Sequence, residues 1–301
     1  ILAVFFSLSC ILALGFMGNG VQANSIGEAV QNAFNISPYI TGAVVALLGG
    51  FVFFGGLKRI ASFTEKVVPV MAGLYILICV VIIVINHANI LTAFESIFVN
   101  AFSTKSILGG FLGMGVKKAI RYGVARGLFS NEAGMGSTPH AHAIAKVKNP
   151  VEQGNVALIT VFIDTFVVLT LTALVILTAN LGDGVLTGIT LTQKSFEAAL
   201  GHVGNIFIAV ALFFFAFSTI IGWYFFGEAN IKYLFGKKAI NIYRVLVMAA
   251  IFIGSTQKVE LVWELADLFN GLMVIPNLIA LLLLNKLVLE TSDKYDKVNN
   301  L

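Results

Sequence analysis

Long apolar stretches separated by short polar connections run through the whole chain. Eight of them come close to the length that a membrane-spanning helix needs, about 20 mostly apolar residues. They lie at 1–24, 38–56, 66–88, 116–145, 154–179, 204–231, 240–256 and 260–285. Two shorter amphipathic segments, 91–102 and 191–200, fit helices that lie at the membrane interface or cover a vestibule. The pattern predicts an all-α integral membrane protein with about eight transmembrane helices.

The stretch at 116–145 is interrupted where it should cross the hydrocarbon. Residues 127–139 read GLFSNEAGMGSTP, with three glycines, a proline, an asparagine and a glutamate. Lipid offers no hydrogen bonds, so non-helical backbone at this depth occurs only inside protein or beside a cavity. We expect the entering helix to end near Phe129 and a second half-helix to start within 130–138.

A broken helix exposes backbone groups that can bind a ligand. Carbonyl ends favour a cation, and amide ends favour a carboxylate. An amino acid zwitterion with a co-transported sodium ion would satisfy both, as in transporters with discontinuous helices. Glycines allow the substrate to approach the backbone closely, and Ser130 and Asn131 add side-chain oxygens. The alternative is a Gly-Pro kink packed against a neighbouring helix.

Two carboxylates fall inside the apolar stretches, where a charge costs several kcal/mol unless it is paired or functional. Glu132 is a proton carrier, a cation ligand, or a structural anchor for Arg121 or Arg126. Asp164 is a second coupling acid or a core residue that is satisfied by neighbouring polar groups such as Thr165. The sequence leaves these alternatives open.

Further polar residues share helical faces. Ser218 and Thr219 are adjacent hydroxyls in mid-stretch, suitable as hard ligands for sodium, and Trp223 lies one turn beyond Thr219. The alternatives are that the hydroxyls bond their own helix carbonyls and that Trp223 only packs. Asn19 and Gln22, three apart in the first stretch, line a substrate site or pack against another helix.

Composition and charge agree with a membrane protein. The chain is 58% hydrophobic and 11% charged, with a mean hydropathy of +0.94. Every second connection between the apolar stretches is rich in basic residues, and this predicts that these connections lie on the cytoplasmic side. These are Lys58, Arg59, Lys66, Lys146, Lys148, Lys232, Lys237, Lys238, Arg244, Lys286, Lys294 and Lys297. The opposite connections carry Lys105, Lys194 and Lys258.

Other functional classes find no support in the sequence. There is no nucleotide-binding signature and no nucleophile with an oriented base, so we expect neither an enzyme nor a nucleic-acid partner. His140 and His142 alone are too few for a metal site. Cys10 and Cys79 lie in apolar runs and are expected to be buried. No cofactor and no obligate protein partner are predicted.

The broken stretch and the four after it make one five-helix unit. Many transporters contain two such units of opposite orientation, each opening with a discontinuous helix. Residues 116–285 would form the second repeat, and 1–90 the last three helices of the first. Residues 91–115 would form an extracellular connection with an interfacial helix, and 286–301 a cytoplasmic tail. On this interpretation the chain is truncated at its N-terminus, and the first broken helix lies upstream.

Several motifs resemble one family, the sodium:alanine symporters, which are alanine or glycine:cation symporters of bacteria and archaea. The similarity extends over essentially the whole chain. The motifs are RGLFSNEAGMGS at 126–137, PHAHA at 139–143, NPVEQG at 149–154, FIDTFVVLTLTALVIL at 162–177, GNGVQANS at 18–25, GGLKRIA at 55–61, FSTIIGWYFFGE at 217–228 and VIPNLIALLLL at 274–284.

The resemblance implies a leucine-transporter-type fold of inverted repeats, with substrate between two unwound helices. The segment from Phe129 through Met135, which includes Ala133 and Gly134, corresponds to the unwound helix of the second repeat. Ser218 and Thr219 match the helix of the sodium site, and Trp223 matches a pocket wall. Asn19 and Gln22 fall on the helix beside the substrate. Family members are longer than this chain, which lacks the first unwound helix.

The sequence therefore predicts a plasma-membrane transporter that imports alanine or glycine with sodium by alternating access. Two alternatives stay open. One is a proton-coupled amino acid permease of the same fold that uses Glu132 or Asp164. The other is an amino acid sensor that binds without transporting.

Overall fold

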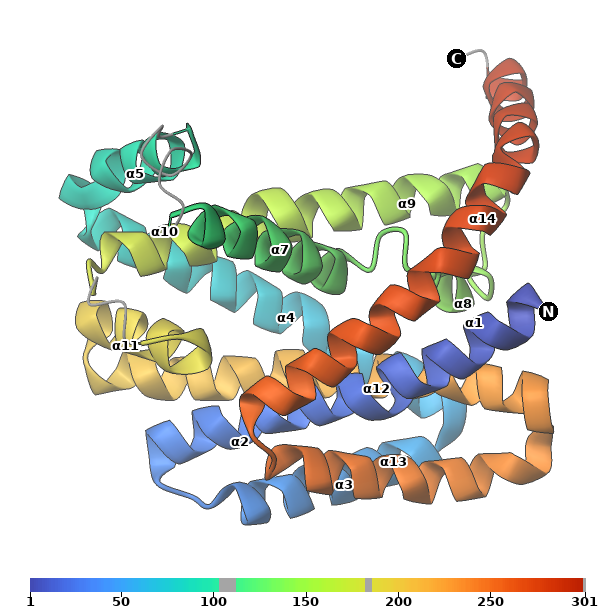
Figure 1. Cartoon of the computed structure of the whole chain (residues 1–301), viewed down its shortest axis with the longest axis horizontal. Helices are drawn as coiled ribbons and strands as arrows, with labels where there is room; N and C mark the ends of the chain where they lie inside the picture. Colours follow the sequence, from blue (N-terminus) through green and yellow to red (C-terminus); the bar gives the residue numbers. More distant parts are fainter. Residues whose placement is uncertain (103–111, 182–185, 300–301) are drawn as a thin grey trace.

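The computed structural model describes residues 1–102, 112–181 and 186–299, and every regular element in these ranges is helical (Figure 1). The first helix is continuous from Leu2 to Phe34. It consists of α1 (Leu2–Cys10), a π-helical segment η1 (Ile11–Gly18) and α2 (Asn19–Phe34). It ends where Asn35 adopts a left-handed conformation, with φ 56°. The next helix starts with a proline, whose fixed φ suits a first helical turn.

The remaining elements follow in two groups. Up to the predicted break they are α3 (Pro38–Phe54), α4 (Gly56–Ile85), η2 (His87–Asn89), α5 (Ile90–Phe102) and α7 (Leu112–Asn131). After it they are α8 (Pro139–His142), α9 (Pro150–Phe162), the π-helical η3 (Ile163–Leu169), α10 (Thr170–Thr178), α11 (Gly188–Leu200), α12 (His202–Phe235), η4 (Lys237–Ala239), α13 (Ile240–Ser255) and α14 (Val259–Asn299).

Six of the described helices are long and apolar enough to cross a membrane. They are Leu2–Phe34, Ser62–Ile85, Pro150–Thr178, His202–Phe235, Lys237–Ser255 and Glu260–Val298. The predicted span 38–56 coincides with α3, which is apolar but has 17 residues, and α7 does not reach the same apolar length. Helices stand at each predicted position, but the count of eight membrane-spanning helices stays a prediction.

The predicted connections differ in how far the structure describes them. The segment 91–115 contains α5, but its residues 103–111, including Lys105, lie outside the described residues. The predicted segment 191–200 belongs to α11, which packs against α2 and α12. Helix α14 continues through the predicted tail as far as Asn299.

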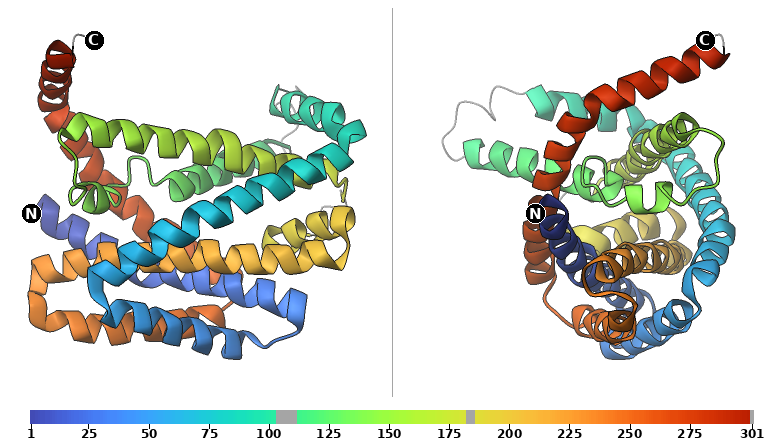
Figure 2. Two further views of the ribbon diagram at one scale, coloured as in Figure 1. Left: turned by 180° about the vertical axis from the view of Figure 1, so that it is seen from behind. Right: turned by 90° about the vertical axis from the view of Figure 1, so that its right-hand side faces the viewer.

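The helices form a layered bundle. Helices α3 and α13 lie side by side at one edge, α2 and α12 pack next to them, and α7, α9 and α10 lie on the opposite side (Figure 1). Helix α14 crosses α1 and η1, and its C-terminal part projects from the bundle (Figure 2). Large apolar side chains face outward on several helices: Leu158 on α9 is 71% exposed, and Leu282 on α14 is 80% exposed. Such surfaces need an apolar environment such as lipid.

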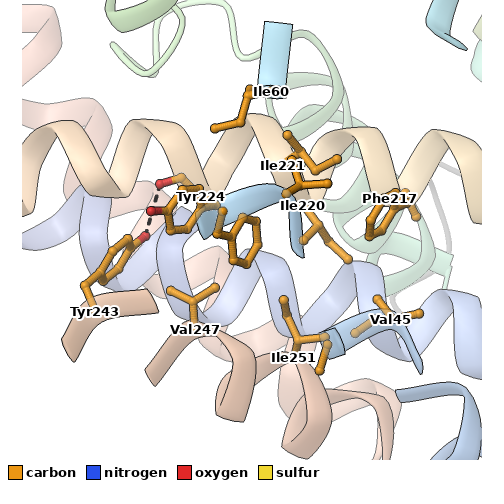
Figure 3. Close-up of a cluster of buried hydrophobic side chains, with 14 of the residues drawn as sticks. Val45, Ile60, Phe217, Ile220, Ile221, Tyr224, Tyr243, Val247 and Ile251 are labelled. Atoms are coloured by element: carbon orange, nitrogen blue, oxygen red, sulfur yellow. Dashed lines mark hydrogen bonds between the residues drawn. The ribbon is translucent and has the colours of Figure 1, made fainter. Parts of the chain in front are cut away.

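The largest buried cluster joins α2, α3, α12 and α13 (Figure 3). The ring of Tyr224 stacks on Phe53, with centroids 3.9 Å apart, and on Tyr243 at 5.5 Å. The Tyr243 hydroxyl donates a hydrogen bond to the Tyr224 carbonyl at 3.4 Å. Arg244 Nε donates to the Tyr224 hydroxyl at 3.0 Å, and that hydroxyl donates to Glu228. The cluster fixes α12 as the central helix of the fold.

Close backbone contact between α2 and α13 gives a first testable prediction. A Cβ on Gly254 would lie 2.4 Å from the Cα of Gly20, and backbone cannot yield as a flexible side chain can. We expect Gly254→Ala to lower the free energy of unfolding by about 2 kcal/mol, which is within the usual range for an overpacked contact. Thermal unfolding in detergent would show it as a lower Tm.

The matched control is the facing glycine. A Cβ on Gly20 would have Gly254 Cα as its nearest neighbour, at 3.5 Å, which is ordinary contact. Gly20→Ala should therefore leave the Tm unchanged or raise it slightly, since alanine favours helix over glycine. Equal loss of stability in the two variants would contradict the packing described.

Candidate functional site

The predicted break is present. Helix α7 ends at Asn131, two residues later than expected, and Glu132, Gly134 and Gly136 all have positive φ, at 53°, 82° and 83°. The second half differs from the prediction: no half-helix starts within 130–138, and the four-residue α8 begins only at Pro139. The physical reason is that two left-handed glycines interrupt the helical conformation, and Pro139 then supplies a residue suited to a first turn.

Glu132 closes the break and links it to α12. Its carboxylate accepts hydrogen bonds from the Ser137 hydroxyl within the break and from the Trp223 indole N–H on α12. The expectation of an arginine anchor is wrong. Arg126 is bound elsewhere, and Arg121 lies over its neighbour Tyr122. Two neutral donors hold Glu132 because the backbone turns at this residue and carries the side chain to α12.

Arg126 forms a two-point ion pair with α14. Its Nη1 and Nη2 lie 2.6 Å and 3.1 Å from the two carboxylate oxygens of Asp267. The guanidinium also lies over the ring of Trp263, at 3.8 Å from the centroid. Because each of the two guanidinium nitrogens bonds one carboxylate oxygen, the pair fixes the relative orientation of the two side chains as well as pairing their charges. The end of α7 is therefore tied to α14 one turn before Phe129.

Phe129 is the aromatic centre of the site. Its ring lies 5.1 Å from Trp223 in an edge-on arrangement and 5.0 Å from Trp263. Trp223 also packs on the backbone of the first helix, because a Cβ on Gly18 would lie 2.7 Å from its ring. Phe129 and Trp223, both predicted as substrate residues, thus come together between α7, α12 and η1.

Helix α14 also supports the turn that follows Glu132. The Asn277 amide donates to the Gly134 carbonyl at 2.7 Å. The same side chain lies so close to Gly136 that a Cβ there would be 2.7 Å from its Oδ1. Ala133 is exposed, whereas Met135 is buried. The backbone of the break is therefore held from the α14 side.

The residues after the turn are anchored by the two histidines. His140 Nδ1 lies 2.8 Å from the Ser137 carbonyl, and its Nε2 lies 3.0 Å from the Asn230 amide on α12. His142 Nδ1 lies 2.7 Å from the Gln153 amide on α9. Both rings thus connect α8 to neighbouring helices.

Ser130 and Asn131 take part in a different contact. The Ser130 hydroxyl and the Asn131 amide donate to the Asp164 carboxylate at 2.8 Å and 2.5 Å, and the amide also reaches the Thr165 hydroxyl at 2.9 Å. Asp164 and Thr165 belong to the π-helical η3, and such wide turns often mark functional positions. The structure therefore divides the predicted substrate residues between the Phe129 centre and the Asp164 contact.

The predicted residues of the first helix differ in burial. Asn19 is fully buried, its amide donates to the Gly15 carbonyl at 3.0 Å, and its Oδ1 has no hydrogen-bond partner. Gln22 is half-buried. Asn19 directly follows Gly18, the residue against which Trp223 packs. An unsatisfied buried acceptor is a natural place for a ligand's donor group.

The two predicted sodium residues bond within their own helix. The hydroxyls of Ser218 and Thr219 donate to the Phe215 carbonyl at 2.8 Å and 3.0 Å. This is the alternative that the sequence left open, but it does not occupy the oxygen lone pairs, which stay available to a cation. The Glu132 carboxylate contacts α12 at Trp223, and Thr219 lies one helical turn before Trp223. The carboxylate therefore lies about one turn along α12 from these hydroxyls.

A pocket of about 130 Å³ opens between α7 and α14 beside the break. Phe129 and Met135 form part of its wall, and Asp267 and Asn270 supply its polar side. Asn270 is 7% exposed, and its Oδ1 is a buried acceptor with no hydrogen-bond partner. Two of the predicted substrate residues therefore line an open space between α7 and α14.

The contribution of α14 was not predicted from the sequence. Trp263, Asp267, Asn270 and Asn277 lie on one helical face and contact α7 or the break. The signal was present in their spacing: polar residues that recur at intervals of three, four or seven in an apolar helix mark a face turned toward protein.

Comparison with known proteins gives a consistent result. The chain matches the sequence model of the Sodium:alanine symporter family over residues 1–300. It is 42% identical to the sodium/alanine symporter AgcS of Methanococcus maripaludis, over 99% of this chain and 66% of that protein. It is 41% identical to a probable sodium/glutamine symporter, GlnT, of Bacillus subtilis, over 98% of this chain and 62% of that protein.

A third relative, from Bacillus sp. strain PS3, is named a sodium/proton-dependent alanine carrier protein. It is 38% identical over 92% of this chain and 65% of its own length. The chain thus spans just under two thirds of the length of these relatives.

Proposed function

The chain belongs to the sodium:alanine symporter family, and from that premise we propose that it is part of a secondary transporter coupling sodium entry to uptake of a small neutral amino acid. The family is one of transporters, and the six long apolar helices make the chain an integral membrane protein. The observation that carries the proposal is the broken helix, tied through Glu132 to Trp223 on the helix that bears Ser218 and Thr219.

The proposed sodium ligands are the Ser218 and Thr219 hydroxyls. Hydroxyl and carbonyl oxygens are hard ligands of the kind that alkali and alkaline-earth cations take. The last carbonyls of α7 lie at the negative end of a helix dipole. Glu132 adds a carboxylate to the same region and thereby favours a cation there.

The proposed substrate site surrounds the Phe129 centre. Phe129, Met135 and Trp223 supply apolar walls, Ala133 and Gly134 supply open backbone, and Asn19 supplies an unsatisfied acceptor for an ammonium group. Ser130 and Asn131 at the end of α7 and Gln22 on α2 are the further polar groups that we propose for the site. The names of relatives mention both alanine and glutamine, so the substrate class is a small neutral amino acid.

The fold proposed for the complete protein is the leucine-transporter type, with the break in the second of two inverted repeats.

Sodium entry supplies about 2.3 kcal/mol per 100 mV, and a tenfold gradient adds about 1.4 kcal/mol. Together they support roughly 500-fold accumulation of a neutral solute. In alternating access, sodium stabilises the arrangement that closes on substrate. We place the protein in the plasma membrane, with sodium as its only co-ligand and no obligate protein partner.

Proton coupling is the second candidate. The printed name of one relative includes protons as well as sodium, and Glu132 and Asp164 are carboxylates within the helical bundle. A proton gradient that drives uptake without sodium would favour this candidate. Binding of amino acid without accumulation would favour a sensor.

The proposal is tested by uptake of radiolabelled alanine into vesicles containing the full-length gene product that carries these residues. We expect an inward sodium gradient to drive accumulation and Thr219→Ala to reduce it at least tenfold, because the cation loses a ligand. Thr178→Ala is the matched control, since Thr178 on α10 also bonds its own helix carbonyl, at 2.7 Å. Equal effects in the two variants would leave Thr219 a purely structural residue and overturn its assignment.

A further inference from the structure

A groove lies at the connection between α8 and α9, which the basic residues assign to the cytoplasmic side. It is formed by α8, the connection 143–149 and the first turns of α9, and its volume is about 480 Å³. The two helices lie next to each other near α14 (Figure 1). The residues that line the groove are exposed or half-buried, so it opens at the surface. It lies apart from the proposed substrate and sodium residues, none of which lines it.

The lining of this groove is apolar and carries no negative charge. Its walls are mainly small apolar residues such as Ala143, Val147 and Ala157. Its polar residues are His142 and Gln153, whose side chains form the hydrogen bond of 2.7 Å described above. No acidic side chain of the described residues lines the groove. The lining therefore accepts apolar groups and does not repel an anion.

Two lysines give this edge of the molecule its positive charge. Lys146 and Lys148 stand on either side of Val147, and all three residues are exposed. Glu152, the one acid in the sequence 139–157, does not line the groove. An exposed apolar residue between two lysines suits the membrane interface, where apolar groups enter the acyl region and ammonium groups stay at the phosphates.

The helix that forms one side of the groove faces lipid. Helix α9 begins the apolar span Pro150–Thr178, of which only 11% of the most apolar part is buried inside the protein. Large side chains are exposed along it, among them Val156, Leu158 and Phe162. A lipid whose headgroup lies at the groove therefore has an apolar protein surface beside its acyl chains.

We propose that the groove between α8 and α9 binds an anionic phospholipid of the cytoplasmic leaflet. The phosphate pairs with Lys146 and Lys148, the glycerol region enters the groove, and the acyl chains lie along α9. The groove is about three times as large as the cavity of about 150 Å³ that holds benzene, which is enough for this part of a lipid. A zwitterionic lipid carries no net charge to balance the lysines, so the site selects by charge.

Lipid at this site acts on the break through α8. His140 on α8 is tied to the Ser137 carbonyl, within the break, and to Asn230 on α12. A lipid that bridges α8 and α9 holds these contacts in place and binds the folded protein better than the unfolded chain. Bound lipid therefore raises the Tm.

The test is thermal unfolding of the full-length gene product in detergent with added ligand. The probes are phosphatidylglycerol, phosphatidylcholine with the same acyl chains, and inorganic phosphate. We expect phosphatidylglycerol at about 100 times its Kd to raise the Tm by about 4 °C. Phosphatidylcholine and inorganic phosphate should each change the Tm by less than about 1 °C.

Two variants locate the site. Lys146→Gln combined with Lys148→Gln removes the charge, and Gly154→Leu fills the groove from α9, where a Cβ meets no atom within 4 Å. Each should reduce the Tm rise with phosphatidylglycerol at least by half.

Matched controls exist for both variants. Lys237→Gln combined with Lys238→Gln removes the same charge from exposed residues of another cytoplasmic connection. Gly73→Leu places a leucine at an exposed glycine of α4 whose Cβ would also meet open space. Both controls should keep the full Tm rise.

The proposal fails on several outcomes. An equal Tm rise with phosphatidylcholine or with inorganic phosphate would overturn the anionic lipid as the occupant, and so would the absence of any rise with phosphatidylglycerol. A full rise in both groove variants would overturn the location. An equal loss in the Lys237 and Lys238 control would show a diffuse attraction to basic residues in place of a site.

Discussion

Replacing Glu132 with leucine is expected to abolish uptake and to lower the free energy of unfolding by about 3 kcal/mol. The carboxylate is the common acceptor for the Trp223 indole N–H and the Ser137 hydroxyl. Leucine would leave both donors without a partner in a site where water is scarce, and each unpaired buried group costs about 1–3 kcal/mol. Thermal unfolding in detergent and alanine uptake in vesicles measure the two effects.

Glu132→Gln separates the hydrogen bonds of this residue from its charge. The glutamine oxygen can accept from Trp223, and its amide can donate to the Ser137 hydroxyl, which has acceptor lone pairs. If Glu132 only holds the break in place, this variant keeps most of the stability and most of the sodium-driven uptake. A stable Glu132→Gln protein with no uptake would show that the negative charge itself takes part in coupling.

Gly136→Ala is expected to cause the second large loss, about 3 kcal/mol of stability and most of the uptake. Gly136 has φ 83°, where an L side chain costs about 1–2 kcal/mol. A Cβ there would also lie 2.8 Å from the Phe6 ring and 2.7 Å from Asn277 Oδ1. Asn277 would have to move, and its hydrogen bond to the Gly134 carbonyl would be lost. The loss of Tm and of vesicle uptake measures the effect.

The neighbouring glycine provides the control. Gly134 has nearly the same φ, 82°, but a Cβ there meets no atom within 4 Å. Gly134→Ala therefore carries only the backbone strain and should lower stability by about 1–2 kcal/mol. A loss in Gly134→Ala as large as that in Gly136→Ala would show that contact with α14 does not matter.

The position of the break could be predicted from sequence because local chemistry determines it. Gly134 and Gly136 are weak helix formers and Pro139 cannot donate a helical backbone hydrogen bond, so an interruption at 132–138 is expected from the residue types. The all-helical architecture follows from apolar length in the same way. Several helix positions agree with the prediction to within a few residues, as Pro38–Phe54 does with 38–56.

The partners of the charged residues could not be predicted. Arg126 and Asp267 are 141 positions apart, and only the packing of α14 across α7 brings them together. The pairing of Ser130 and Asn131 with Asp164 likewise depends on the π-helical turn in η3, which shifts a side chain around the helix relative to regular α geometry. The local sequence showed which polar residues are unusual within an apolar stretch, but tertiary contacts decide what each of them binds.

Sodium and a small neutral amino acid are expected to cross the membrane together. The most direct measurement is uptake of radioactive sodium by vesicles containing the full-length gene product, with an inward alanine gradient and the membrane potential clamped. Symport predicts that alanine drives sodium inward in wild type and Thr178→Ala and fails to do so in Thr219→Ala. Sodium entry that ignores alanine, while alanine drives protons inward, would contradict the account.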